Sequence, residues 1–142
     1  MIELNGTSLT LTEVSRVSRA GEPACLSLDA KAAIERSRAA VEQMLSSGAA
    51  IYGLTTGFCK FAEKRIADAD TELLQRNLIV SHACGTGDPL PKEAVRATML
   101  LRLNALARGY SGIRLSTMET LLAMLNRGVH PVIPEKGSLG AS

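Results

Sequence analysis

The sequence contains very few aromatic residues. Aromatic side chains make up 3% of its 142 residues, and there is no tryptophan. Surfaces that bind single-stranded nucleic acid stack bases on aromatic rings, so this composition argues against such a surface. Hydrophobic residues still account for 46% of the chain, which excludes a disordered class. The core must therefore be built from aliphatic side chains, methionine and alanine, a composition that suits packed helices.

Clustered charge and paired cysteines are also lacking. The formal net charge is +2, with Lys and Arg scattered along the chain, so no nucleic-acid partner is expected. Cys25, Cys59 and Cys84 are widely spaced and include no Cys-x-x-Cys pair, which argues against a disulfide framework or a structural zinc site. The two histidines, His82 and His130, do not make a metal site, so no metal is predicted.

Targeting and membrane-spanning segments are not apparent. The first five residues lack the basic and apolar regions of a signal peptide. The most apolar stretch is interrupted by Arg102 and is too short to cross a bilayer. We therefore expect a cytoplasmic protein without a membrane partner.

Capping residues and glycine stops predict a mainly α-helical chain. Two helix starts carry a capping box, Thr10 with Glu13 and Ser116 with Glu119, and Asp29 is the expected cap of another helix. The glycines at 21, 48 and 128 are expected to close these three helices. The predicted helical spans are 10–20, 29–47, 70–83, 91–108 and 116–127.

A small β element and a long loop complete the predicted fold. Residues 24–28 favour a short extended segment, with residues 2–4 as the candidate partner in a small sheet, and residues 49–68 show no clean periodicity. Apolar residues nearly surround the helix over 91–108, so it should be buried in a bundle or an oligomer interface. An isolated chain should accordingly not be a stable monomer. We predict one mainly helical domain over residues 1–142.

The loop contains the first chemical candidate, Tyr52. It precedes Gly53, Thr55, Thr56 and Gly57, and the glycines permit the tight backbone that phosphate loops and active-site lids need. The spacing of a P-loop is absent. A tyrosine in a loop is usually a packed surface ring, but it can act as a general base where its surroundings lower its pKa. The residues alone leave both interpretations open.

His82 is the second candidate. It follows Ser81 near the end of a predicted helix, ahead of a glycine-rich turn. A solitary histidine more often caps a helix C-terminus or packs in a core than it binds a ligand. The glycine- and serine-rich tail, residues 137–142, is similarly open, since such composition usually marks a loop.

Four segments, in order and over nearly the whole chain, resemble the N-terminal portion of the histidine ammonia-lyases, a branch of the aromatic amino acid ammonia-lyase family. Any one of the motifs would be weak, whereas four in the family's order and spacing are specific. The segments are Tyr52-Gly53-Leu54-Thr55-Thr56-Gly57-Phe58, Ser81-His82-Ala83, Gly109-Tyr110-Ser111-Gly112-Ile113-Arg114 and Gly137-Ser138-Leu139-Gly140-Ala141-Ser142.

The resemblance implies a helical lyase fold, a cofactor and a reaction. The family's 4-methylidene-imidazol-5-one (MIO) forms autocatalytically from an Ala-Ser-Gly triad, which would comprise Ala141, Ser142 and a following Gly that this chain does not contain. Tyr52 matches the family's catalytic base, and Ser81 with His82 matches the pair that recognises the substrate side chain in the histidine branch. The implied reaction is elimination of ammonia from L-histidine to give urocanate, in a homotetramer that includes the remainder of the same lyase.

Two departures keep alternatives open. Cys59 stands where the family usually has Gly, and the remaining segments, which supply the triad Gly, a carboxylate-binding Arg and the central bundle, are not in this sequence. A phenylalanine or tyrosine ammonia-lyase, an aminomutase of the same family, and a helical interaction module without chemistry are the alternatives. Comparing the turnover of histidine, phenylalanine and tyrosine would separate the enzymatic alternatives. A complete Ala-Ser-Gly triad would distinguish any of these enzymes from the helical module without chemistry.

Overall fold

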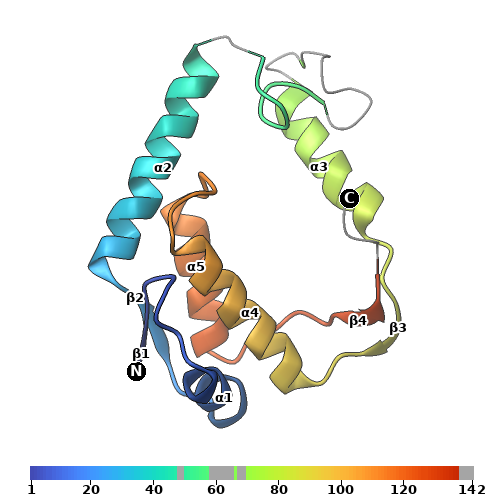
Figure 1. The fold of residues 1–142 in the computed structure, drawn as a ribbon. Helices are drawn as coiled ribbons and strands as arrows, with labels where there is room; N and C mark the ends of the chain where they lie inside the picture. Colours follow the sequence, from blue (N-terminus) through green and yellow to red (C-terminus); the bar gives the residue numbers. More distant parts are fainter. Residues whose placement is uncertain (48–49, 58–65, 67–69, 138–142) are drawn as a thin grey trace. The chain divides into compact units, whose positions relative to one another are not determined.

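The computed structural model describes residues 1–47, 50–57, 66 and 70–137, and these are mainly helical, as predicted (Figure 1). The chain divides into two compact units, unit 1 comprising Met1–Ala40 and Pro89–Ile133 and unit 2 comprising Val41–Asp88 and Pro134–Ser142. None of the helices in the described ranges is long and apolar enough to span a membrane. The elements are β1 (Ile2–Leu4), α1 (Leu11–Ala20), β2 (Ala24–Leu26), α2 (Leu28–Ser46), α3 (Thr71–His82), β3 (Thr86–Pro89), α4 (Lys92–Leu106), α5 (Leu115–Asn126) and β4 (Pro134–Lys136).

Unit 1 contains the aliphatic core that the composition predicts. Helix α4 packs between α1 and α5, and buried side chains from all three helices meet those of the two N-terminal strands. The residues that are fully buried there are Leu4, Val17, Ile34, Leu100, Leu103, Met118 and Leu125.

The predicted N-terminal β element is confirmed as a parallel pair. Ile2 lies opposite Ala24 and Leu4 opposite Leu26 in β1 and β2, with α1 as the connection between the strands. Asn126 at the end of α5 binds both backbone groups of Ala24, accepting from its N–H and donating to its carbonyl at 2.9 Å each. The pair of strands is thereby held against the helical layer.

Helix α1 begins at the predicted capping box, whereas α2 is not capped by Asp29 as predicted. The amide of Glu13 donates to Thr10 Oγ1 at 3.3 Å, and the Glu13 carboxylate accepts from the Thr10 amide at 2.8 Å. In α2 the cap is instead Ser27, whose Oγ accepts from the amide of Ala30 at 3.1 Å. Asp29 lies inside the first turn, where its charge complements the helix dipole. The predicted stop at residue 48 lies outside the described residues.

The capping box predicted at Ser116 is wrong. Helix α5 begins at Leu115, and the preceding Arg114 makes no side-chain cap. Leu115 packs against the core, so tertiary packing extends the helix past the local cap signal. The predicted stop at Gly128 is confirmed, since this residue has φ 72° and its amide and that of Val129 bond to carbonyls of the last turns.

Helix α4 is buried within the chain on one side only. Val95, Met99 and Leu103 lie in the core, whereas Leu101 on the other side is 51% exposed. The sequence predicts burial on nearly every side because it shows no polar face. Coverage of Leu101 by a partner stays a prediction.

His130 gives unit 1 an expected pH dependence. Burial, with Lys92 and Arg96 nearby, lowers the pKa of His130 below its usual value of 6.5, and its Nε2 atom is buried without a hydrogen-bond partner among the described residues. As pH falls through about 6.5, the unfolded chain takes up a proton that the folded chain does not, so the free energy of unfolding should fall. Thermal melts between pH 7.5 and 5 should show a shallower decline for His130→Gln than for the wild type. Parallel declines would contradict this prediction.

Candidate active site

Tyr52 lies in a tight turn whose backbone is closed by its own neighbours. The amides of Leu54 and Thr55 donate to the carbonyl of Ile51 at 3.1 and 3.0 Å, and the amide of Ile51 donates to Thr55 Oγ1 at 2.8 Å. Gly53 has φ 70°, a conformation that favours glycine. The sequence placed this segment in a loop, and its described part is an ordered turn.

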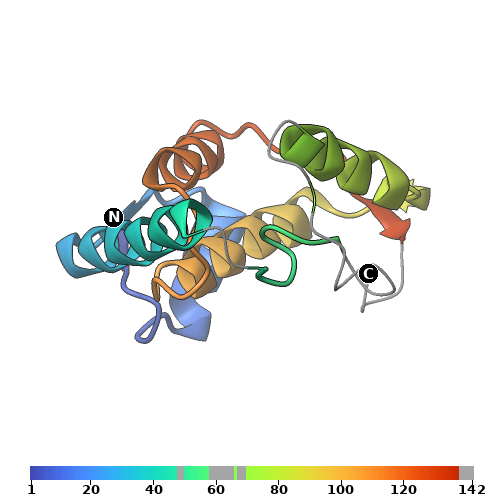
Figure 2. The ribbon, with the colours of Figure 1, turned by 90° about the horizontal axis from the view of Figure 1, so that it is seen from above.

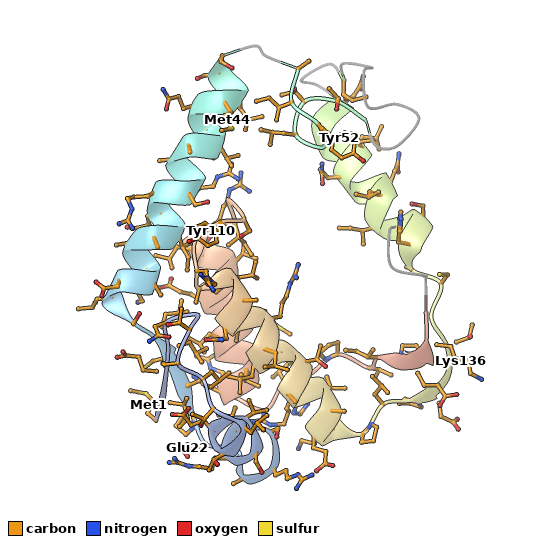
Figure 3. The ribbon with its side chains drawn as sticks, in the orientation of Figure 1. Met1, Glu22, Met44, Tyr52, Tyr110 and Lys136 are labelled. Atoms are coloured by element: carbon orange, nitrogen blue, oxygen red, sulfur yellow. The ribbon has the colours of Figure 1, made fainter. Side chains whose placement is uncertain are left out.

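The two hydroxyls beside Tyr52 have structural roles. Thr55 and Thr56 are buried, and Thr56 Oγ1 donates to the carbonyl of Gly57 at 3.1 Å. Tyr52 itself is 60% exposed on the turn (Figure 3). The threonines thus fix the backbone, and the tyrosine ring is the group that the turn presents outward.

Ser81 and His82 occupy the last turn of α3 and share one backbone acceptor. His82 Nδ1 lies 2.8 Å from the carbonyl oxygen of Leu78, and Ser81 Oγ donates to the same oxygen at 2.9 Å. Ser81 Oγ is also 3.0 Å from His82 Nδ1. Because a carbonyl oxygen only accepts, the short contact to Leu78 requires the proton on Nδ1.

This tautomer determines what His82 can offer a ligand. With the proton on Nδ1, the neutral ring has an unprotonated Nε2, which is an acceptor and has no hydrogen-bond partner among the described residues. His82 therefore lies at the end of a helix, as expected, and its Nε2 atom is available to accept a hydrogen bond from a ligand. The sequence analysis did not identify the contact with the Leu78 carbonyl. Ser81 and His82 follow Leu78 by three and four residues, and this spacing, which places the three residues on one helical face, could have indicated it.

The structure brings together part of the predicted site. Ser81 and His82 are coupled, whereas Tyr52 is not among the described hydrogen-bond partners of His82, although both residues belong to unit 2. Ala141, Ser142 and Cys59 lie outside the described residues. The described site is thus an outward-facing tyrosine on a rigid turn and a tautomer-fixed histidine at a helix end.

A positively charged hollow in unit 1 has a structural explanation for part of its charge. It measures about 680 Å³ and is lined by Arg19, Lys92, Glu93, Arg96 and Arg127, at the C-terminal ends of α1 and α5 and the N-terminal end of α4. The C-termini of α1 and α5 carry partial negative charge, which the nearby arginines compensate, and Arg96 donates to a carbonyl at each of these two ends. Arg19 is paired with Glu93.

Comparisons with known proteins agree on one family for this chain. The sequence model of the aromatic amino acid lyase family matches residues 9–142. A histidine ammonia-lyase of Alkaliphilus oremlandii is 54% identical over 99% of this chain and 28% of its own length. Among solved structures, histidine ammonia-lyase from Trypanosoma cruzi aligns with TM-score 0.89 and 37% identity, over 98% of this chain and 27% of its own. Tyrosine aminomutase from Streptomyces globisporus aligns with TM-score 0.91 and 34% identity, over 98% and 26%.

The chain belongs to the aromatic amino acid lyase family, and its predicted ammonia-lyase fold is confirmed. The curated relatives at 51–54% identity carry the name histidine ammonia-lyase. The chain spans about 28% of the length of these relatives.

Proposed function

We propose that this chain is the N-terminal part of a histidine ammonia-lyase, which eliminates ammonia from L-histidine to give urocanate. Its 54% identity with curated histidine ammonia-lyases supports the branch. The observation that carries the choice of substrate is the pair Ser81 and His82, with Nδ1 bonded to the Leu78 carbonyl. An imidazole side chain offers the N–H that an acceptor on His82 would bind, and a phenyl side chain does not.

The residue types at the end of the chain fit the family's cofactor. Cyclisation of the backbone needs small residues and a serine whose hydroxyl can leave, and Ala141 and Ser142 are of these types. Ala141, Ser142 and a following Gly would form the MIO group, which supplies an electrophile that activates the substrate amine for departure. A chain without that Gly cannot cyclise, so formation of the group belongs to the longer protein.

His82 would bind and orient the substrate ring. Its Nε2 accepts a hydrogen bond from an imidazole N–H, and the ring orientation of His82 is fixed by Leu78 and Ser81. Ser81 is a positioning residue in this scheme, since it acts through the carbonyl that His82 also contacts. Orienting the substrate in this way raises the reaction rate, because the substrate loses its rotational freedom on binding and not during the reaction step.

Tyr52 would remove the proton from the β-carbon of the substrate. A phenolate accepts this proton while the amine leaves as ammonia, and the double bond forms between the α- and β-carbons. The turn that holds Tyr52 is closed by backbone and threonine hydrogen bonds, so the ring is presented on a rigid support. The single-domain organisation, the remainder of the lyase, a homotetrameric assembly and a cytoplasmic location stay predictions from the resemblance and the sequence.

Turnover and peptide mass together test the proposed function. The full-length protein should convert L-histidine to urocanate at least about tenfold faster than it converts phenylalanine, since a phenyl ring leaves Nε2 of His82 unpaired. It should also prefer histidine to tyrosine, whose O–H donor lies further from the β-carbon than an imidazole N–H does. The tryptic peptide beginning at Gly137, released after Lys136, should be lighter than its coded mass by two waters. Faster turnover of phenylalanine or tyrosine, or formation of a β-amino acid, would indicate the related lyases or aminomutases. An uncyclised peptide would indicate an inactive helical module.

A further inference from the structure

The hollow of unit 1 lies where the ends of three helices meet. Helix α4 packs against both α1 and α5 (Figures 1 and 2), and the hollow is lined by the C-terminal ends of α1 and α5 and by the first residues of α4. Its volume of about 680 Å³ is within the range of about 300–1,000 Å³ that small-molecule sites occupy. A ligand of the size of a small metabolite therefore fits it.

The structural roles of the cations in this hollow account for only part of its charge. Arg19 pairs with Glu93, and the C-termini of α1 and α5 carry about half a negative charge each. These two ends offset about one further cation, and Arg96, which donates to a carbonyl at each of them, is the cation in place to do so. Lys92 and Arg127 have no ion-pair partner among the described residues, so about two positive charges remain.

Arg96 also has hydrogen-bond donors that its contacts with the protein do not use. Its side chain is 5% exposed, and its Nε, Nη1 and Nη2 atoms each donate once, to the carbonyls of Val17 and Leu125. A guanidinium has five N–H groups, so one N–H on each Nη atom has no partner among the described residues. A buried donor without a partner lowers stability, and an acceptor bound in the hollow that Arg96 lines would satisfy these groups.

The first turn of α4 offers further donors to the hollow. Pro91 precedes the helix and makes no side-chain cap, and its carbonyl accepts from the amides of Ala94 and Val95. The amides of Lys92 and Glu93 have no hydrogen-bond partner among the described residues. Such amides at a helix N-terminus favour a bound anion. The hollow thus combines two unpaired cations, guanidinium N–H groups and helix amides, which are the donors that phosphate oxygens accept.

We propose that the hollow of unit 1 binds a phosphate group, held by Lys92, Arg127 and the unused N–H groups of Arg96. A phosphate group carries about −1.5 to −2 charges near neutral pH, which matches the charge that remains better than a single carboxylate does. Its several oxygens can accept from the guanidinium groups and the amides at the same time. The lining residues all belong to unit 1 and include none of the candidate active site, so this proposal is independent of the lyase function.

Calorimetric titration of the full-length protein with inorganic phosphate, in chloride buffers of constant ionic strength, tests the proposal. We expect saturable binding, and Arg127→Ala and Lys92→Ala should each weaken it by about tenfold, because each removes a charged donor. Arg102→Ala is the matched control, since Arg102 is an exposed cation of α4 that does not line the hollow. Its loss should change Kd by less than about twofold, because salt screens a charge outside the site.

A second titration with adenosine monophosphate distinguishes the sources of the phosphate. Tighter binding than that of inorganic phosphate would assign an organic phosphate to the site, and equal or weaker binding would assign free phosphate. Absence of saturable binding of both probes overturns the proposal, as does an affinity that Arg127→Ala and Lys92→Ala leave unchanged. An equal loss in Arg102→Ala also overturns it, since that result indicates general charge attraction. Arg127→Gln, which keeps a long polar side chain, replaces Arg127→Ala if the latter unfolds, and the same tenfold loss is expected.

Discussion

Replacing Tyr52 with phenylalanine should lower kcat for L-histidine by about 10²- to 10⁴-fold, the range expected for loss of a general base. The ring is 60% exposed, and the hydrogen bonds that close the turn come from the backbone and from Thr55 and Thr56. Removing the hydroxyl should therefore leave these hydrogen bonds of the turn in place. Steady-state urocanate formation, the peptide mass from Gly137 and the thermal midpoint would separate lost chemistry from lost structure.

Tyr110→Phe is the matched control for this experiment. Tyr110 is the other tyrosine of the chain, is 83% exposed and stacks under the Arg108 guanidinium at 5.5 Å. Loss of its hydroxyl should leave kcat within about twofold, since a general-base contribution is assigned to Tyr52 alone. Retention of more than about a tenth of kcat in Tyr52→Phe, or an equal loss in Tyr110→Phe, would remove Tyr52 from the role of base.

The helices were predictable where their signals are local and packing agrees with them. Thr10 and Glu13 form the predicted capping box, and Gly21 and Gly128 end their helices. The same four-residue pattern at Ser116 fails because Leu115, one residue earlier, gains core contacts by joining the helix. A capping signal contributes about 1 kcal/mol, which burial of one leucine side chain can exceed.

The two-stranded sheet that β3 forms with β4 was not predictable from its residues. Thr86-Gly87-Asp88-Pro89 consists mainly of residues that are depleted in strands, and its partner begins at Pro134, far along the chain. Only the resemblance, and no periodicity, singled out Tyr52, Ser81 and His82 as a set. Which ring nitrogen of His82 carries the proton could be assigned only from the coordinates, because the Leu78 carbonyl, and no side chain, determines it.

Arg96→Leu should lower the free energy of unfolding of unit 1 by about 3–6 kcal/mol, since two carbonyls lose a charged donor and such hydrogen bonds contribute about 1.5–3 kcal/mol each. Arg96 is 5% exposed and lines the hollow of unit 1, and its Nε and Nη2 donate to the carbonyl of Val17 at 3.2 and 2.8 Å. Its Nη1 donates to the carbonyl of Leu125 at 2.9 Å. These two carbonyls lie in the last turns of α1 and α5, where helix carbonyls lack partners from their own helix.

The fork of the guanidinium explains why lysine should not replace it. One ammonium cannot reach the Val17 and Leu125 carbonyls in the planar arrangement that Arg96 uses, so Arg96→Lys should recover less than half of the loss. Arg19→Ala is the control, because its ion pair with Glu93 is exposed at 3.2 Å and such pairs contribute about 0–1 kcal/mol. Hydrogen exchange in Arg96→Leu should accelerate most in peptides covering the ends of α1 and α5. Uniform acceleration, or an Arg19→Ala effect as large, would contradict the view that Arg96 joins two helix ends through α4.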